Sequence, residues 1–265
     1  VRVKADSQTQ MSSEPEQVAV KDYGSNSDRT QNFDSDWKFN LGDVSNAQTP
    51  TFDDSKWRTL SLPHDYSIEQ EYSQSLEAES GYLPGGVGWY RKNFTLGEEA
   101  KGKRIRIDFD GVYMNATVYV NGKEVGTHPY GYTPFSFDIT DYISYDKENT
   151  IAVKVDHQTP SSRWYSGSGI YRSVSLTTTN DVHVDLNGIK VESNNLAKEA
   201  GKTVNTDIKT TVINDSKEAQ NVTVTHTVFK KGEKPDKAIG TFTTEAQEIG
   251  AGKKAEISAT VPVKN

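Results

Sequence analysis

The feature that most constrains the fold is a strict alternation of apolar and charged residues over positions 104–109. Every second side chain there is Ile or Phe, which is the pattern of a β-strand with one buried face. A second alternating run, residues 116–120, ends at Asn121–Gly122, a pair typical of a two-residue hairpin turn. Consecutive strands joined in this way form an antiparallel sheet, and the sequence therefore predicts an all-β fold.

The composition excludes several classes of protein. The chain has 265 residues, enough for one large or two medium domains. It contains no Cys, and its 5 His show no metal-ligand spacing, so we expect no disulfide and no metal site. A formal net charge of −7 argues against a nucleic-acid partner. No apolar run reaches the ~20 residues of a membrane span. The glycines at 85–88 are not followed by Lys-Ser/Thr, as a phosphate loop would be, and we expect no cofactor.

Changes in composition along the chain predict three segments. Residues 1–30 are polar, and we expect a disordered leader or linker there. Residues 31–180 carry most of the aromatic side chains and form the first domain. Residues 181–265 contain few aromatic residues and six short strand patterns separated by turn signals, which predict a small β-sandwich. An immunoglobulin-like sandwich has about seven strands, so we expect this second domain to be truncated at its C-terminal end.

The candidate site is centred on a long connection, Ser161–Arg172, between strand patterns at 149–157 and 173–179. It is rich in Gly and Ser but also carries one Trp, two Tyr and two Arg, which a simple turn does not need. Large side chains on a loop held by a sheet are typical of ligand recognition. The alternative is that Trp164 and Tyr171 fold back and cap one end of the sandwich.

A second candidate lies at a strand end, where His64 and Asp65 follow a Pro. A His beside a carboxylate is a common arrangement for handling protons at a ligand site. The alternative is local turn chemistry, in which Asp65 accepts hydrogen bonds from neighbouring backbone groups.

Several motifs, taken in order, resemble the N-terminal part of glycoside hydrolase family 2, the β-galactosidase and β-glucuronidase family. They include Leu-Pro-His-Asp-Tyr at 62–66, Gly-Tyr-Leu-Pro-Gly-Gly-Val-Gly-Trp-Tyr-Arg-Lys at 81–92, Tyr-Gly-Tyr-Thr-Pro-Phe-Ser-Phe-Asp-Ile-Thr at 130–140 and Gly-Ser-Gly-Ile-Tyr-Arg at 167–172. The resemblance covers roughly residues 36–265. Within the family, the chain is most similar to the large surface β-galactosidases of streptococci.

The resemblance implies a jelly-roll sugar-binding domain, then an immunoglobulin-like domain, then a (β/α)8 barrel. In this family the catalytic carboxylates lie on the barrel, so no catalytic residue is expected in this chain, and alone it should be inactive. The expected partners are the barrel of the same polypeptide and galactose-terminated glycans, with no nucleic acid and no membrane insertion. The expected location is extracellular or attached to the cell wall.

The family also indicates which residues contact substrate. Several relatives carry a substrate-binding Asp six residues before the second Gly of the 167–172 motif, and here that position is Arg163. We expect Arg163 to donate to sugar hydroxyls and Trp164 to shape the rim, with Tyr165 and His64 completing the set. A family Asn contact falls on Gly85, and Asp65 is the candidate substitute.

Two other readings stay open at this stage. One is an autonomous carbohydrate-binding or adhesion module. The other is a portion of a β-glucuronidase or β-mannosidase, in which Arg163 pairs with a uronic acid carboxylate.

Overall fold

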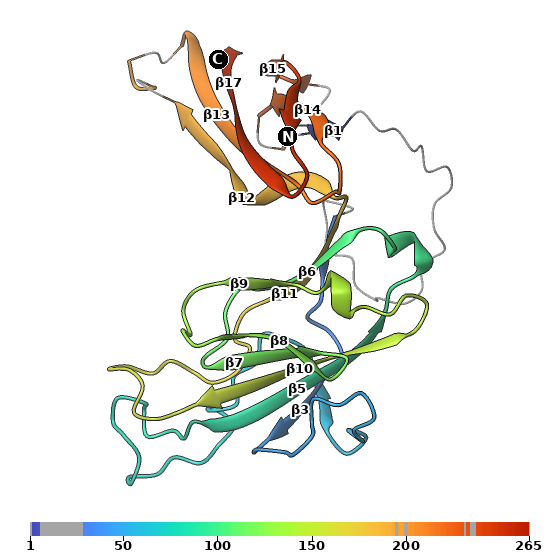
Figure 1. Ribbon diagram of the computed structural model, residues 1–265. Coiled ribbons are helices and arrows are strands. Elements are labelled where there is room, and N and C mark those ends of the chain that lie inside the picture. Colours follow the sequence, from blue (N-terminus) through green and yellow to red (C-terminus); the bar gives the residue numbers. More distant parts are fainter. Residues whose placement is uncertain are drawn as a thin grey trace. The chain divides into compact units, whose positions relative to one another are not determined.

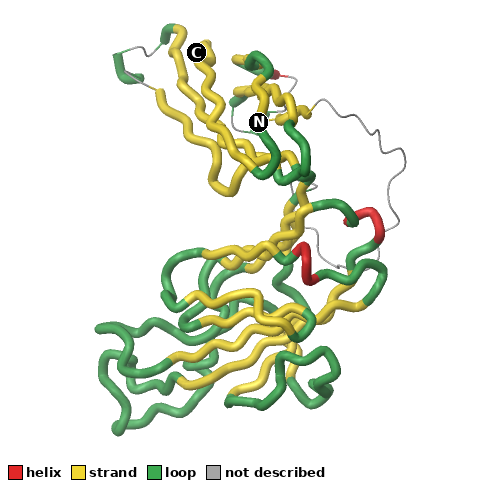
Figure 2. The backbone as a smooth tube through the Cα atoms, viewed as in Figure 1, coloured by secondary structure: helices red, strands yellow, loops and turns green. Residues whose placement is uncertain are grey.

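A computed structural model describes residues 2–5, 29–193, 196–198, 201–230, 232–233 and 237–264. The described chain consists of strands and loops with two short 3-10 turns, η1 (Glu98–Ala100) and η2 (Thr140–Tyr142), as Figure 2 shows. The all-β prediction is therefore confirmed. The chain divides into two compact units: a large unit within residues 14–178, and a small unit that combines residues from the first thirteen with residues 179–265.

The large unit is a sandwich of two sheets (Figure 1). The first sheet has the strand order β4 (Arg58–Leu60), β3 (Trp37–Leu41), β5 (Gly86–Thr95), β10 (Glu148–His157), β7 (Ala116–Val120) and β8 (Lys123–His128). The second has the order β2 (Thr30–Asn32), β11 (Val174–Thr179), β6 (Arg104–Phe109) and β9 (Phe135–Asp138). The predicted hairpin is confirmed, since β7 and β8 are joined by Asn121 and Gly122, both at positive φ (51° and 81°).

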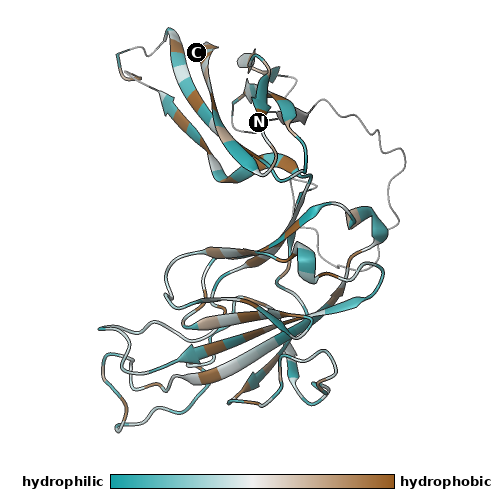
Figure 3. Cartoon of the chain, viewed as in Figure 1, coloured by the Kyte–Doolittle hydropathy of each residue, from teal (hydrophilic) through white to brown (hydrophobic). Residues whose placement is uncertain are grey.

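The core of the large unit lies between these two sheets, where the alternating residues meet. Ile105, Ile107 and Phe109 are at most 1% exposed, while the charged residues between them lie on the outer face. Figure 3 shows the same alternation of apolar and polar residues along the strands. Burying one such side chain contributes roughly 1.5–3 kcal/mol, so this core is rigid enough to hold the loops at its ends.

A smaller apolar cluster covers the outer face of the six-stranded sheet. Residues 42–57 fold over Trp89 and Ala152, and bring Trp57 and Ala47 against them. Arg91, only 1% exposed, reaches into this segment and pairs with Asp54 at 2.7 Å. A buried guanidinium needs such a partner, because an unpaired buried charge is strongly destabilising.

The small unit contains seven strands in the described residues. One sheet has the order β12 (Val182–Ser193), β13 (Thr203–Asn214), β17 (Lys253–Lys264). The other contains β1 (Arg2–Ala5), β14 (Gln220–Val228), β15 (Gly240–Thr243) and β16 (Gln247–Ile249), with β14 paired to the other three. Sheets of three and four strands are typical of an immunoglobulin constant-type sandwich.

The strands of the small unit differ from the six that the sequence predicts. The patterns at 182–184 and 189–191 belong to one strand, β12, interrupted by a bulge. The short strand β16 gives almost no periodic signal, and β1 comes from the opposite end of the chain. The expected truncation of this domain rested on the count of six strands, and it stays a prediction.

The predicted leader is also corrected in part. Residues 2–5 form β1, in antiparallel register with residues 222–225 of β14, and are not disordered. Residues 6–28 lie outside the described residues. The contacts separate the two units between residues 178 and 179, beside the boundary at 180–181 that the composition indicates.

Candidate functional site

Two long connections meet at one end of the large sandwich. The first, here called the 61–85 loop, joins β4 to β5, and the second, here called the aromatic loop (residues 158–173), joins β10 to β11. Backbone hydrogen bonds link them, from His64 N to Ile170 O (2.8 Å) and from Tyr66 N to Ser168 O (2.9 Å). The sequence signals for these two segments, more than 90 positions apart, thus converge on one place.

The Asp65 carboxylate holds the two loops together. Its Oδ1 accepts hydrogen bonds from the backbone N–H groups of Ser67 (2.9 Å) and Ser168 (2.8 Å), and its Oδ2 accepts one from the Tyr165 phenol. Gly167 adopts φ +75°, and a Cβ there would lie 2.8 Å from Oδ2, so only glycine fits this approach. Asp65 therefore shows the turn chemistry that was the alternative reading, extended across the chain to the aromatic loop. A contact between Asp65 and sugar stays a prediction.

His157, at the end of β10, ties down both ends of the aromatic loop. Its ring bonds Ser168 through Nδ1 and Ser161 through Nε2 (3.0 Å), and Ser168 in turn bonds Ser67. Burial lowers the pKa of His157, outweighing the opposing charges of Asp65 and Asp156. The neutral ring donates through one nitrogen and accepts through the other, which suits two serine hydroxyls.

Trp164 projects from the aromatic loop and is 61% exposed, yet it is held in place. Its indole Nε1 donates to the Tyr132 hydroxyl (2.9 Å), which also bonds Ser166 Oγ (2.8 Å). The reading in which Trp164 folds back to cap the sandwich is therefore wrong. Tyr171 does fold back, being half-buried, and donates to the Gly131 carbonyl at 2.7 Å.

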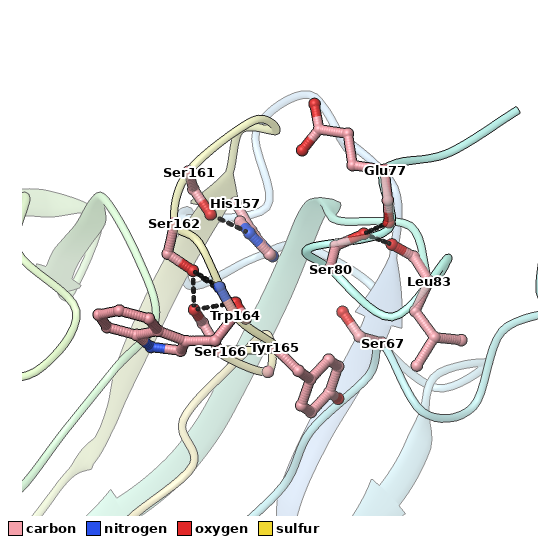
Figure 4. A pocket seen from close by; sticks show the side chains of 11 residues that line it. Ser67, Glu77, Ser80, Leu83, His157, Ser161, Ser162, Trp164, Tyr165 and Ser166 are labelled. Atoms are coloured by element: carbon pink, nitrogen blue, oxygen red, sulfur yellow. Dashed lines mark hydrogen bonds between the residues drawn. The ribbon is translucent and has the colours of Figure 1, made fainter.

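Arg163 directly precedes Trp164 and Tyr165, the two residues whose rings are held, and its own side chain is exposed. Among the described residues, none forms a hydrogen bond or ion pair with it. Figure 4 shows the two rings leaving the loop on different sides. The loop thus holds the two residues that follow Arg163 and leaves the five N–H donors of Arg163 available to a ligand.

His64 belongs to a separate cluster. Its Nδ1 lies 2.7 Å from the Tyr90 hydroxyl, and its Nε2 lies 2.9 Å from Arg58 Nη2 and 3.2 Å from Glu69 Oε1. Burial lowers the pKa of His64, with Glu69 acting in the opposite direction. His64 and Asp65 therefore have different partners and do not form the polar pair that their adjacency suggests. The assignment of His64 to substrate stays a prediction.

Gly85 occupies the position of the family's Asn contact. A Cβ built there would lie 2.5 Å from the His157 carbonyl oxygen, closer than any real Cβ contact. A side chain at 85 would push against the strand end that carries His157, which explains why this sequence has glycine there.

A small depression lies between the two loops (Figure 4). Its polar lining comes mainly from the serines at 67, 80, 161, 162 and 166, and its one carboxylate is Glu77. Retaining glycoside hydrolysis needs two carboxyl groups about 5 Å apart, and the lining of this depression contains only one.

Within the described residues, no three His, Asp or Glu side chains are grouped closely enough to hold a metal ion. No helix in this part of the chain is long and apolar enough to cross a bilayer.

Sequence reasoning missed Tyr132, His157 and Ser168, which hold the site together. Tyr132 lies in a family motif, which was a usable signal, but its contact with Trp164 spans 32 positions and depends on the fold. His157 ends a strand pattern and carried no signal of its own.

Comparisons with known proteins identify the family of this chain. The model of "Glycosyl hydrolases family 2, sugar binding domain" matches residues 30–180. The β-galactosidase BoGH2A of Bacteroides ovatus is 47% identical over 195 residues, which are 72% of this chain and 23% of that enzyme. A β-glucuronidase of Formosa agariphila is 30% identical over 264 residues, which cover 89% of this chain and 26% of that enzyme.

A comparison with solved structures points to the same family. The crystal structure of a glycosyl hydrolase family 2 member from Bacteroides cellulosilyticus superposes with a TM-score of 0.78 at 34% identity, covering 89% of this chain and 31% of that one. The chain spans roughly a quarter to a third of the length of these relatives. It belongs to glycoside hydrolase family 2, and its large unit is the N-terminal sugar-binding domain of that family.

Proposed function

We propose that this chain is the non-catalytic N-terminal portion of a retaining exo-β-galactosidase that removes terminal β-linked galactose from glycans. It packs on a (β/α)8 barrel of the same polypeptide, which carries the two catalytic Glu residues, and contributes rim residues to the galactose subsite. The β-galactosidase BoGH2A, 47% identical over 195 residues, supports this choice of substrate.

The observation that carries the proposal is that the Arg163 side chain is exposed and has no partner among the described residues, on a loop whose next two residues are held in place. Trp164 and Tyr165, the two residues that follow it, are held by Tyr132 and Asp65. A guanidinium without a partner has all its donors available to sugar hydroxyls, and its planar set of donors suits several hydrogen bonds at once.

A β-glucuronidase is the second candidate, because several similar proteins bear that name and an Arg guanidinium can bind a carboxylate with two parallel hydrogen bonds. Intact enzyme assayed with nitrophenyl β-galactoside, β-glucuronide and β-mannoside separates the candidates. We expect kcat/KM to be at least about 100-fold higher for the galactoside, since a site built for one set of polar groups rejects others strongly. A preference for the glucuronide would replace the proposal with the second candidate.

An autonomous carbohydrate-binding module is tested with the isolated chain. We expect no hydrolysis and no binding of galactosides at millimolar concentration, because the subsite is completed only by the barrel. Binding by the isolated chain would favour the module. A surface location and a particular similarity to streptococcal enzymes also stay proposals, and labelling of intact cells with an antibody against this chain tests the location.

A further inference from the structure

We propose that Trp164 is a stacking platform for the second sugar of the substrate, the pyranose to which the terminal galactose is linked. The inference rests on the proposed function and adds to it a binding position outside the galactose subsite. It arises from the contrast between how exposed the indole is and how firmly it is held.

The indole is fixed by contacts from a different segment of the chain. Tyr132, between β8 and β9, accepts the hydrogen bond from Trp164 Nε1 and is itself packed edge-on against Tyr113 at a centroid distance of 5.2 Å. The Trp164 carbonyl accepts hydrogen bonds from Ser162 and Ser166 on its own loop. A ring that is 61% exposed normally rotates freely, so these contacts hold one face of the indole in a defined direction.

A second exposed ring extends this surface. Tyr130 is 57% exposed and meets Tyr132 edge-on, with ring centroids 5.6 Å apart. Tyr130, Tyr132 and Trp164 thus form an aromatic strip made by two segments, in which two exposed rings are joined through the half-buried Tyr132. Clustered exposed aromatic residues on a soluble domain are typical of a binding surface.

The chemistry of the strip favours a pyranose ring. The C–H groups on one face of a pyranose carry partial positive charge, and the face of an indole carries partial negative charge. The only polar atom of the indole, Nε1, is already bonded to Tyr132. Trp164 therefore offers a flat apolar face and no hydrogen bond to a ligand.

The lack of a free hydrogen-bonding group on Trp164 indicates which of the two sugars its indole binds. Selecting galactose over other terminal sugars requires hydrogen bonds to particular hydroxyls, and Arg163 has the free donors for that. A face without donors makes no hydrogen bond to an individual hydroxyl, so it selects among sugars less sharply than Arg163 does. It suits the neighbouring sugar, whose identity varies from one glycan to another.

The test compares two substrates of the intact enzyme. Methyl β-galactoside has no second sugar, whereas lactose has one. We expect Trp164→Ala to lower kcat/KM for lactose about tenfold, mainly through KM, the scale on which an aromatic anchor contributes. For methyl β-galactoside the loss should be clearly smaller than for lactose, and Trp164→Phe should restore most of the loss because it keeps a ring.

Tyr132→Phe serves as the companion variant, since it removes only the hydroxyl that holds the indole. It should give a smaller loss that is again larger for lactose than for methyl β-galactoside. Equal losses on both substrates for Trp164→Ala, or no loss on either, would contradict the proposal that Trp164 stacks against the second sugar. An intact enzyme that hydrolyses neither galactoside contradicts the proposed function itself, so the two failures are distinct.

Discussion

The carboxylate of Asp65 accepts a hydrogen bond from the phenol of Tyr165, 100 positions further along the chain. The same carboxylate accepts the backbone N–H groups of Ser67 and Ser168, both at most 2% exposed. One acidic side chain thus sets the position of the loop that presents Arg163.

Removing this carboxylate should loosen the loop. Asp65→Ala leaves two buried N–H groups without an acceptor, and we expect the free energy of unfolding to fall by ~1–3 kcal/mol. Asp65→Asn keeps one carbonyl oxygen for those groups and should lose less. Tyr165→Phe, which removes only the phenol contact, should lose least. Urea denaturation of the isolated chain measures all three, and an Asp65→Ala variant as stable as the parent would contradict this role.

Gly85 should not tolerate the Asn that other family members carry. The Cβ would lie 2.5 Å from the His157 carbonyl oxygen, so the strand end must shift, at a cost of ~1–3 kcal/mol. We expect Gly85→Ala and Gly85→Asn to lower the Tm of the large unit, measured by calorimetry. Gly250→Ala is the control, because its new Cβ would meet only the Lys253 side chain at 3.5 Å. Equal Tm values for Gly85→Ala and the parent would contradict the packing argument.

Stability should decrease in mildly acidic solution. Burial lowers the pKa of His157 in the folded state below its unfolded value of about 6.5. Above that value the ring is neutral in both states and its contribution is fully present. As pH falls through the unfolded pKa towards the folded one, the unfolded chain binds the proton first and stability is lost.

His157→Gln keeps a hydrogen-bonding group that does not titrate. We expect it to reduce the fall in Tm between pH 7 and pH 5, while His183→Gln, in the small unit, should leave the large unit's pH dependence as it is. The dependence will not vanish, because burial also lowers the pKa of His64. A His157→Gln profile identical to the parent's would show that the ring does not control this loss.

The sequence was sufficient for the fold of the large unit because its strand signals are local. The alternation over 104–109 and the turn at Asn121–Gly122 are read within a few residues, and both are confirmed. The strand patterns at 149–157 and 173–179 also located the aromatic loop between the correct strands. The order of these patterns along the chain was enough to show which two strands the loop connects.

Long-range pairing is what the sequence could not show. β1 pairs with β14, more than 200 positions away, so residues 2–5 read as part of a polar leader. In the same way, no pattern near Asp65 or Trp164 indicates that Tyr165 and Tyr132 are their partners. His64 and Asp65 looked like a pair because they are adjacent, but they bond to different elements.

The most direct test of the account is the kcat/KM of Arg163→Ala in the intact enzyme. With a β-galactoside substrate we predict a fall of about tenfold to a hundredfold, the effect of losing ~1.5–3 kcal/mol of hydrogen bonding to a charged group. Arg163→Lys should recover only part of the loss, because Lys lacks the planar set of donors. The Tm should not change, since no described residue pairs with this side chain. Kinetics within about twofold of the parent would contradict the role of the loop in recognising galactose.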